Sequence, residues 1–282
     1  MKSSHLKTTS LLGLFGLLTS SWMAFAGSEN RTIAAGGSIT EIMYALGLGD
    51  EIIAVDTSSY FPAAAAAKPK VGYFRQLSAE GVLSTQPSRL VAAGGAGPDA
   101  VLQQIRQAGV EVKVFNPEQY NLPAWKSHVR AVGAYFRVPD QANQIIARVD
   151  DQLAELKRPP AGQEKTAIFL MDVGDRGLVA AGLNTVPNML FELAHFNNIV
   201  NEFEGYKPYS AEQLIQSKPD VIVMPSHAVE NIGGVATICQ NLTIAMATAE
   251  RGCDILVVDG LLALGFGTRI DQAVAVLANH ER

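Results

Sequence analysis

Cysteine and charge are both scarce in this sequence of 282 residues. It contains 2 cysteines, Cys239 and Cys253, and 17% of its residues are Asp, Glu, Lys or Arg. Two cysteines are too few for a disulfide scaffold or for a zinc site with four cysteine ligands. The basic residues form no block and the formal net charge is −5, so the electrostatic footprint of a nucleic-acid-binding protein is absent.

The motifs of several common enzyme classes are missing as well. The sequence has no Walker-type phosphate loop, no His-Glu-x-x-His metal motif and no Gly-x-Ser-x-Gly nucleophile turn. Gly36-Gly-Ser38 follows a predicted strand, but it lacks the nucleophile spacing and an evident histidine partner. The histidines show no metal-ligand spacing; they are His5, His128, His195, His227 and His280. An enzyme is therefore poorly supported.

Apolar residues, in contrast, are abundant. They make up 48% of the chain, and the mean hydropathy is +0.14. This composition excludes a disordered or fibrous protein and is sufficient for one or two hydrophobic cores. A chain of this length predicts two domains.

Residues 1–26 have the pattern of a secretory signal peptide. Lys2 and Lys7 precede the short apolar stretch 11–18, and Ala24-Phe-Ala26 supplies the small residues of a cleavage site. A membrane anchor is the alternative, but the apolar stretch is well short of the ~20 residues that a span needs. We therefore predict cleavage after Ala26, export to a periplasm, and no membrane span in the mature protein.

Beyond residue 28, short β-rich runs alternate with helical patterns. Such alternation favours an α/β fold with parallel-rich sheets and helices on both faces. One long polar-faced helix is predicted over 139–158, and it separates an N-terminal lobe, 28–138, from a C-terminal lobe, 163–282. The predicted strands are 32–35, 52–56, 89–93, 110–115, 166–171, 220–224 and 254–258, and the other main helices are 40–48, 99–108, 123–136 and 271–279.

Residues 77–91 and 209–223 form a weak internal repeat. Both segments carry Ser-Ala-Glu, a later proline and a final valine. This is the pattern of an N-capped helix that leads through a proline turn into a strand. Chance similarity is the alternative, and two related lobes with a ligand cleft between them is the favoured interpretation. Glu80 and Glu212 then occupy equivalent helix starts, where they would gain from the helix dipole and would also suit docking onto a partner with two basic sockets.

Tyr73 is the strongest ligand-binding candidate that the residues alone indicate. It lies in a loop between the second and third predicted strands, at the sheet edge where ligands bind in folds of this class. Arg75 lies on the same side if the segment is extended, and a cation there favours the tyrosinate form. Tyrosinate is one of the axial ligands of haem iron. A buried, hydrogen-bonded tyrosine is the simpler alternative for an isolated Tyr-x-Arg.

Four stretches resemble the periplasmic haem-binding proteins of bacterial haem ABC importers, within the cobalamin, siderophore and haem class of substrate-binding proteins. They are 34–42, 71–83, 203–208 and 261–267. The resemblance implies two Rossmann-like lobes, joined by one long helix, that open little on binding. It also implies that the protein captures haem (ferric protoporphyrin IX) and delivers it to an inner-membrane ABC permease. Tyr73 would be the axial haem ligand, Arg75 would support it, and Glu80 and Glu212 would dock onto the permease.

Further cleft candidates rest on position alone. Tyr206 and Lys207 mirror the Tyr-x-Arg pair in the second lobe, and Lys207 would pair with a haem propionate. His227 follows a predicted strand of the C-terminal lobe and is expected to project into the cleft. Ser59 and Tyr60 follow a predicted strand of the N-terminal lobe and would line the cleft rim.

Three functions remain open on the sequence. The first is haem capture by a monomer, the second is the same fold binding a ferric siderophore or a corrinoid, and the third is an exported enzyme. A Soret band on addition of haemin would support the first. Pairing of Cys239 with Cys253 also stays open, because an oxidising periplasm permits it but the distance between the cysteines is not known.

Overall fold

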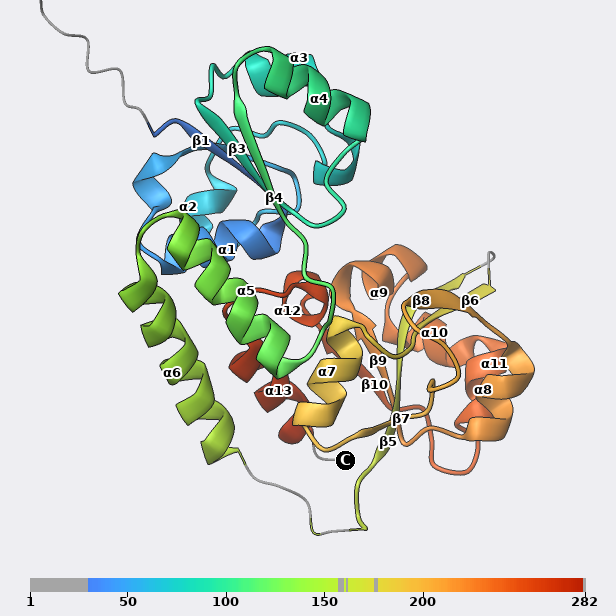
Figure 1. Cartoon of the computed structure of the whole chain (residues 1–282). Helices are drawn as coiled ribbons and strands as arrows, with labels where there is room; N and C mark the ends of the chain where they lie inside the picture. Colours follow the sequence, from blue (N-terminus) through green and yellow to red (C-terminus); the bar gives the residue numbers. More distant parts are fainter. Residues whose placement is uncertain (1–29, 157–159, 161, 175–176, 281–282) are drawn as a thin grey trace, which may run out of the picture.

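The computed structural model describes residues 30–156, 160, 162–174 and 177–280. The predicted signal peptide lies outside these residues. Figure 1 shows an α/β molecule with two lobes, and the long helix α6 (Pro139–Glu155) follows one side of it. No helix within the described part of the chain is both long enough and apolar enough to cross a bilayer.

The N-terminal lobe is built on a parallel sheet of four strands in the order β2-β1-β3-β4. The central strand β1 is fully buried, as its apolar sequence Thr-Ile-Ala-Ala predicts for a sheet covered on both faces. The strands are β1 (Thr32–Ala35), β2 (Ile52–Val55), β3 (Arg89–Ala93) and β4 (Glu111–Phe115). The helices are α1 (Gly37–Ala45), α2 (Ala63–Ala66), α3 (Ala79–Leu83), α4 (Asp99–Gln107) and α5 (Leu122–Tyr135).

The C-terminal lobe has a mixed sheet in the order β10-β9-β5-β6-β8, with β7 pairing β5 off this path. The first three strands are parallel, whereas β6 and β8 add an antiparallel edge. The strands are β5 (Thr166–Gly174), β6 (Gly177–Ala181), β7 (Asn197–Asn198), β8 (Tyr206–Tyr209), β9 (Val221–Pro225) and β10 (Ile255–Val258). The seven predicted strands are all present, and β6, β7 and β8 were not predicted.

Seven shorter helices surround the second sheet (Figure 1). The segment from Cys239 to Cys253 is closed by a disulfide, which answers the question that the sequence left open. The helices are α7 (Val186–Leu193), α8 (Ala211–Ser217), α9 (Ser226–Ile232), α10 (Val235–Gln240), α11 (Leu242–Ala247), α12 (Gly260–Leu264) and α13 (Ile270–Ala278).

The two lobes are joined by polar contacts that are mostly buried. Glu41 of α1 is 3% exposed, and its carboxylate accepts hydrogen bonds from the backbone N–H of Thr268 at 2.6 Å and from Arg269 Nε at 2.9 Å. The indole N–H of Trp125 donates to the carbonyl of Gly267 at 2.6 Å. One hydrophobic core also continues across the junction; it includes Ile39 and Trp125 from the first lobe and Phe169, Phe191 and Val274 from the second. The lobes are therefore fixed to each other by charge and by shared packing.

Candidate ligand-binding cleft

Tyr206 and Lys207 lie within β8, at the antiparallel edge of the second sheet. The other predicted cleft residues follow the carboxyl ends of parallel strands: Ser59, Tyr60, Tyr73 and Arg75 follow β2, and His227 follows β9. Ligands of open α/β sheets bind beyond the carboxyl ends of such strands. The loop after β4 also reaches the second lobe, because the amide N–H of Tyr120 donates to Asn184 Oδ1 at 2.9 Å.

Tyr73 lies on a loop whose backbone is held on both sides. Gly72 precedes it with φ of 97°, a conformation that glycine adopts without strain, and the carbonyl of Gly72 accepts from Thr57 N–H at 2.9 Å. After Tyr73, a 3-10 turn covers Phe74–Gln76. Tyr73 is 42% exposed, and among the described residues its hydroxyl has no hydrogen-bond partner. The alternative of a buried, hydrogen-bonded tyrosine is therefore wrong.

Arg75 lies beside this loop in a way that an extended segment would not produce. Its guanidinium stacks over the Phe74 ring, 4.9 Å from the centroid, and it lies above Gly95 of the loop after β3. A Cβ at Gly95 would be 2.4 Å from Arg75 Nη1, so this position must be glycine for the guanidinium to lie there. The tight turn, rather than alternation along a strand, places the Arg75 cation over Phe74 and beside the loop after β3.

Tyr206 approaches the same region from the opposite lobe. It is 44% exposed, yet the surrounding protein desolvates its hydroxyl, and this burial raises the pKa of Tyr206. Tyr120 raises that pKa further, whereas the Arg75 cation lowers it. Tyr120 and Arg75, both of the first lobe, thus lie within electrostatic range of Tyr206 of the second lobe.

Lys207 lies on the opposite face of β8 from Tyr206, and its pairing with a haem propionate stays a prediction. Successive side chains of a strand point to opposite faces, and Tyr206 and Lys207 are consecutive in β8. The Lys207 ammonium lies 5.4 Å from the centroid of the Phe203 ring. The antiparallel pairing of β8 with β6 therefore turns Lys207 away from the side that Tyr206 occupies.

Tyr60 and His227 meet at the start of α12. The Tyr60 hydroxyl donates to Asp259 Oδ2 at 3.0 Å and accepts from Leu261 N–H at 2.7 Å, so it bridges the lobes. Burial raises the pKa of Tyr60 to about 12. A Cβ at Gly260 would lie 2.5 Å from His227 Nδ1 and 3.7 Å from the Tyr60 oxygen, so both side chains flank this glycine. The strand ends thus bring these two predicted residues together.

The expectation that Ser59 lines the cleft rim is wrong. It is fully buried, and its hydroxyl donates to Asp56 at 2.5 Å and lies 2.8 Å from the Thr40 hydroxyl. Both contacts are internal to the first lobe, so the Ser59 side chain does not line the cleft rim. Its neighbour Tyr60 supplies the rim contact instead.

Glu80 and Glu212 occupy equivalent places in the two lobes. Each lies in the first turn of its helix, α3 or α8, and each is exposed. Ser78 and Ser210 cap the two helices by accepting the N–H three residues later. The predicted helix starts are therefore real, and both carboxylates are open to solvent.

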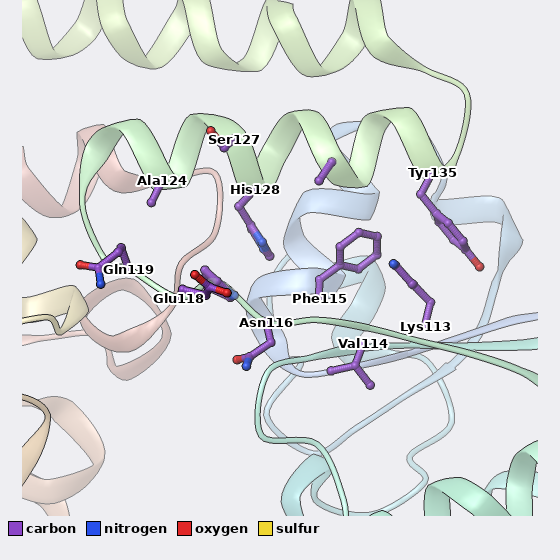
Figure 2. A pocket seen from close by; sticks show the side chains of 12 residues that line it. Lys113, Val114, Phe115, Asn116, Glu118, Gln119, Ala124, Ser127, His128 and Tyr135 are labelled. Carbon is purple, nitrogen blue, oxygen red and sulfur yellow. The ribbon is translucent and has the colours of Figure 1, made fainter.

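A separate recess of about 620 Å³ lies between β4 and α5 (Figure 2). Its walls include the rings of Phe115, His128 and Tyr135, and none of the predicted cleft residues lines it. Burial lowers the pKa of His128 to about 4, so its imidazole is neutral at physiological pH. Within the described ranges, His, Cys, Asp and Glu form no group of three or more that could hold a metal ion.

Sequence reasoning missed three residues that shape this region. Gly95 makes room for Arg75, Tyr120 joins Tyr206, and the buried Asp56 carboxylate binds the backbone of the Tyr73 loop. A signal existed for Gly95, because the glycine-rich run 94–97 directly follows a predicted strand. No pattern in the sequence indicated that Tyr120 would reach the other lobe.

Comparison with known proteins gives a consistent family. The model of the periplasmic binding protein family matches residues 33–251. The apo periplasmic heme-binding protein RhuT from Roseiflexus sp. RS-1 is 31% identical, with a TM-score of 0.80 over 88% of this chain and 98% of that chain. A periplasmic heme-binding protein from Pseudomonas aeruginosa is 32% identical, with a TM-score of 0.76 over 88% and 91% of the two chains.

A curated relative carries a different ligand in its name. The vitamin B12-binding protein of Vibrio campbellii is 26% identical over 210 residues, which are 73% of this chain and 74% of that protein. The family and these relatives comprise substrate-binding proteins, which confirms the prediction against an enzyme and sets aside the alternative of an exported enzyme. The chain belongs to the periplasmic binding protein family, in its cobalamin, siderophore and haem class.

Proposed function

We propose that this protein captures haem, as ferric protoporphyrin IX, and delivers it to an inner-membrane ABC permease. The observation that carries the proposal is Tyr73, which is 42% exposed on a loop anchored at the carboxyl end of β2 and whose hydroxyl has no hydrogen-bond partner among the described residues. A tyrosinate oxygen is a known axial ligand of haem iron. Two of the similar solved structures are named heme-binding proteins, which favours the same ligand.

The surroundings of Tyr73 suit a flat, anionic ligand. The Phe74 ring packs edge-on against Tyr73 with centroids 5.0 Å apart, and Tyr206 faces the region from the other lobe. The Arg75 guanidinium supplies positive charge close by, which favours both a tyrosinate and a ligand carboxylate. Tyr60 and His227 stand at the lobe junction, where they would bound the ligand on its inner side.

A titration of the mature protein with haemin tests the proposal. We expect a Soret band together with the charge-transfer absorption of a ferric phenolate, and we expect the latter to be absent in Tyr73→Phe. Cyanocobalamin is the matched second ligand, because curated relatives are named vitamin B12-binding proteins. Tight binding of cyanocobalamin with no haemin spectrum would replace haem by a corrinoid and leave Tyr73 without an iron to bind.

Delivery would depend on the two capped glutamates. Glu80 and Glu212 are exposed at equivalent helix starts, one on each lobe. Two carboxylates at fixed positions would pair with two basic sockets on the periplasmic side of a permease. This arrangement sets the orientation of the cleft relative to the membrane.

Export completes the proposal. The family is periplasmic by name, and residues 1–26 carry the pattern of a cleavable signal peptide. Expression in a Gram-negative host should yield a periplasmic monomer whose N-terminal sequence starts at Gly27. A protein that stays membrane-bound with Met1 intact would contradict the cleavage.

A further inference from the structure

Asp56 is a buried carboxylate that makes none of the proposed contacts with haem. It follows β2 directly and is fully buried. Its Oδ1 accepts from Gly36 N–H at 2.8 Å and from the Ser59 hydroxyl at 2.5 Å. Its Oδ2 accepts from Ser58 N–H at 2.9 Å, from the Ser58 hydroxyl at 2.7 Å and from Phe74 N–H at 3.3 Å. One side chain thus receives five donors from three segments of the chain.

These contacts converge on the two peptide neighbours of Tyr73. The amide of Phe74 is held by Asp56 itself. The carbonyl of Gly72 is held by Thr57 N–H at 2.9 Å, and Thr57 lies in the short turn that Asp56 closes through Ser58 and Ser59. The backbone before Tyr73 and the backbone after it are therefore both fixed from the same turn.

The charge of Asp56 makes this anchor strong. Hydrogen bonds to an ionised acceptor are stronger than neutral ones, and in a buried setting each lost partner leaves a donor unsatisfied. The Lys70 ammonium lies near enough to interact with the Asp56 carboxylate and donates to the Ser59 carbonyl at 2.9 Å. The anchor also includes Gly36, where a Cβ would lie 2.6 Å from that of Ala93, so the Gly-Gly-Ser stretch serves close packing rather than catalysis.

We propose that Asp56 is a positioning residue for the Tyr73 ligand: it fixes the Tyr73 loop in its binding geometry before any ligand arrives. This inference rests on the proposed haem function. The loop then loses its conformational entropy when the protein folds. Ligand binding is therefore not weakened by the cost of ordering the loop. Tyr73 would present its oxygen from one direction in both the empty and the loaded protein.

Asp56→Asn tests this with minimal change in shape. The carboxamide NH2 cannot accept, and in either orientation it meets a backbone donor, Gly36 on one side or Ser58 and Phe74 on the other. We expect haemin to bind at least about tenfold more weakly, as the loss of about one strong contact implies, with a weakened or shifted ferric phenolate band. Asp271→Asn is the matched control, since Asp271 is a buried carboxylate in α13 that accepts a hydrogen bond from Arg148 of α6 at 2.8 Å.

The control separates positioning from general stability. An Asp271→Asn protein with wild-type haemin affinity and spectrum, beside an impaired Asp56→Asn protein, supports the inference. Equal impairment of both variants, or an unaltered Asp56→Asn spectrum, overturns it. Should Asp56→Asn not fold, hydrogen exchange of the wild-type protein decides: protection of the Phe74 amide in the empty protein equal to that in the loaded protein supports preorganisation, and protection that arises on loading contradicts it.

The same experiments keep the two proposals apart. If wild-type protein shows no Tyr73-dependent spectrum with haemin, the haem function fails. The exchange rate of the Phe74 amide in the empty protein still reports whether the Asp56 contact orders the loop. A haem spectrum that depends on Tyr73 but not on Asp56 would retain the function and reject the inference.

Discussion

At the cleft, the two lobes have closely similar sequences but different backbone structures. Gly72-Tyr73 and Gly205-Tyr206 lie just before the two segments of the internal repeat, and both glycines have positive φ, 97° and 78°. After Tyr73 the chain turns into a 3-10 helix, whereas Tyr206 begins the strand β8. The turn places the Arg75 guanidinium over Phe74, while the strand places Lys207 on the face opposite Tyr206, near Phe203. Local sequence sets the backbone at the glycine, and the neighbouring elements decide the chemistry that follows.

Replacing each tyrosine by phenylalanine gives the largest expected contrast. Tyr73→Phe should lower haemin affinity by about two orders of magnitude or more and remove the ferric phenolate band, because it removes the iron ligand. Tyr206→Phe should change affinity by about threefold or less, since the ring is kept and its hydroxyl is not the proposed ligand. Absorbance titration of both variants measures the difference. Equal losses of haemin affinity in the two variants would contradict the proposal that Tyr73, and not Tyr206, is the iron ligand.

We predict that Glu80 and Glu212, which occupy similar positions in the two lobes, act in the delivery of haem to the permease. The double change Glu80→Ala with Glu212→Ala should abolish haem transfer into permease-containing proteoliposomes while haem affinity stays within about twofold. Each change removes a dipole-scale contribution of about 0.5–1 kcal/mol to folding, which is small beside the total. Each single variant, tested at matched haem loading, shows whether both lobes dock. Transfer at the wild-type rate by the double variant would show that both glutamates only stabilise the starts of their helices.

Acid should affect the first lobe through His128. Its pKa is about 4 in the folded protein, because of burial, against about 6.5 in the unfolded chain. Below pH 6.5 the unfolded state takes up a proton that the folded state does not, so the free energy of unfolding falls until about pH 4, by about 3 kcal/mol in all. Urea unfolding at pH 7 and pH 4.5 measures the loss. His128→Leu should reduce this pH dependence.

A matched change in the second lobe serves as the control. His280 hydrogen-bonds the Asp254 carboxylate at 2.9 Å instead of facing aromatic rings. His280→Gln should leave the His128 component of the acid sensitivity in place. If His128→Leu and wild type lose stability equally between the two pH values, burial of His128 is not the cause.

The smallest contrast involves the two cations of the repeat. Arg75→Met should weaken haemin binding about tenfold, because the guanidinium lies beside the cleft tyrosines and above Gly95. Lys207→Met should leave the affinity within about twofold, because its ammonium packs over Phe203. Isothermal titration at low and high salt compares the two. A stronger effect from Lys207 would show that β8 presents its other face to the ligand.

The sequence was most informative where apolar strands alternate with helices. All the parallel strands except the two-residue β7 were predictable, since strands such as β1, β3 and β9 are short apolar runs bounded by turns. The antiparallel edge was not, because β6 reads Gly-Leu-Val-Ala-Ala without alternation and β8 contains Pro208, which a strand tolerates at a sheet edge. Such strands are stabilised by pairing with a neighbouring strand, and the local sequence pattern does not identify that neighbour.

At the site, the same limit applied to the direction of side chains. The places of Tyr73, Glu80 and Glu212 could be predicted from motifs, because glycine turns and helix caps are local. The burial of Ser59 was not predicted, since it depends on the Asp56 carboxylate, which accepts the Ser59 hydroxyl in the interior of the first lobe. The direction of Lys207 is set by the pairing of β8 with β6, and neither strand could be predicted.

The junction between the lobes has a consequence for how a ligand leaves. Swinging the lobes apart would separate Glu41 from Arg269 and Thr268 and strip the Trp125 N–H of its acceptor. Breaking a buried ion pair of this kind costs about 3–5 kcal/mol, so thermal motion seldom opens it. The lobes therefore keep one spacing, and under the proposed function a flat ligand would enter the cleft edgewise. Its release would then require a partner that binds both lobes at once and breaks these contacts.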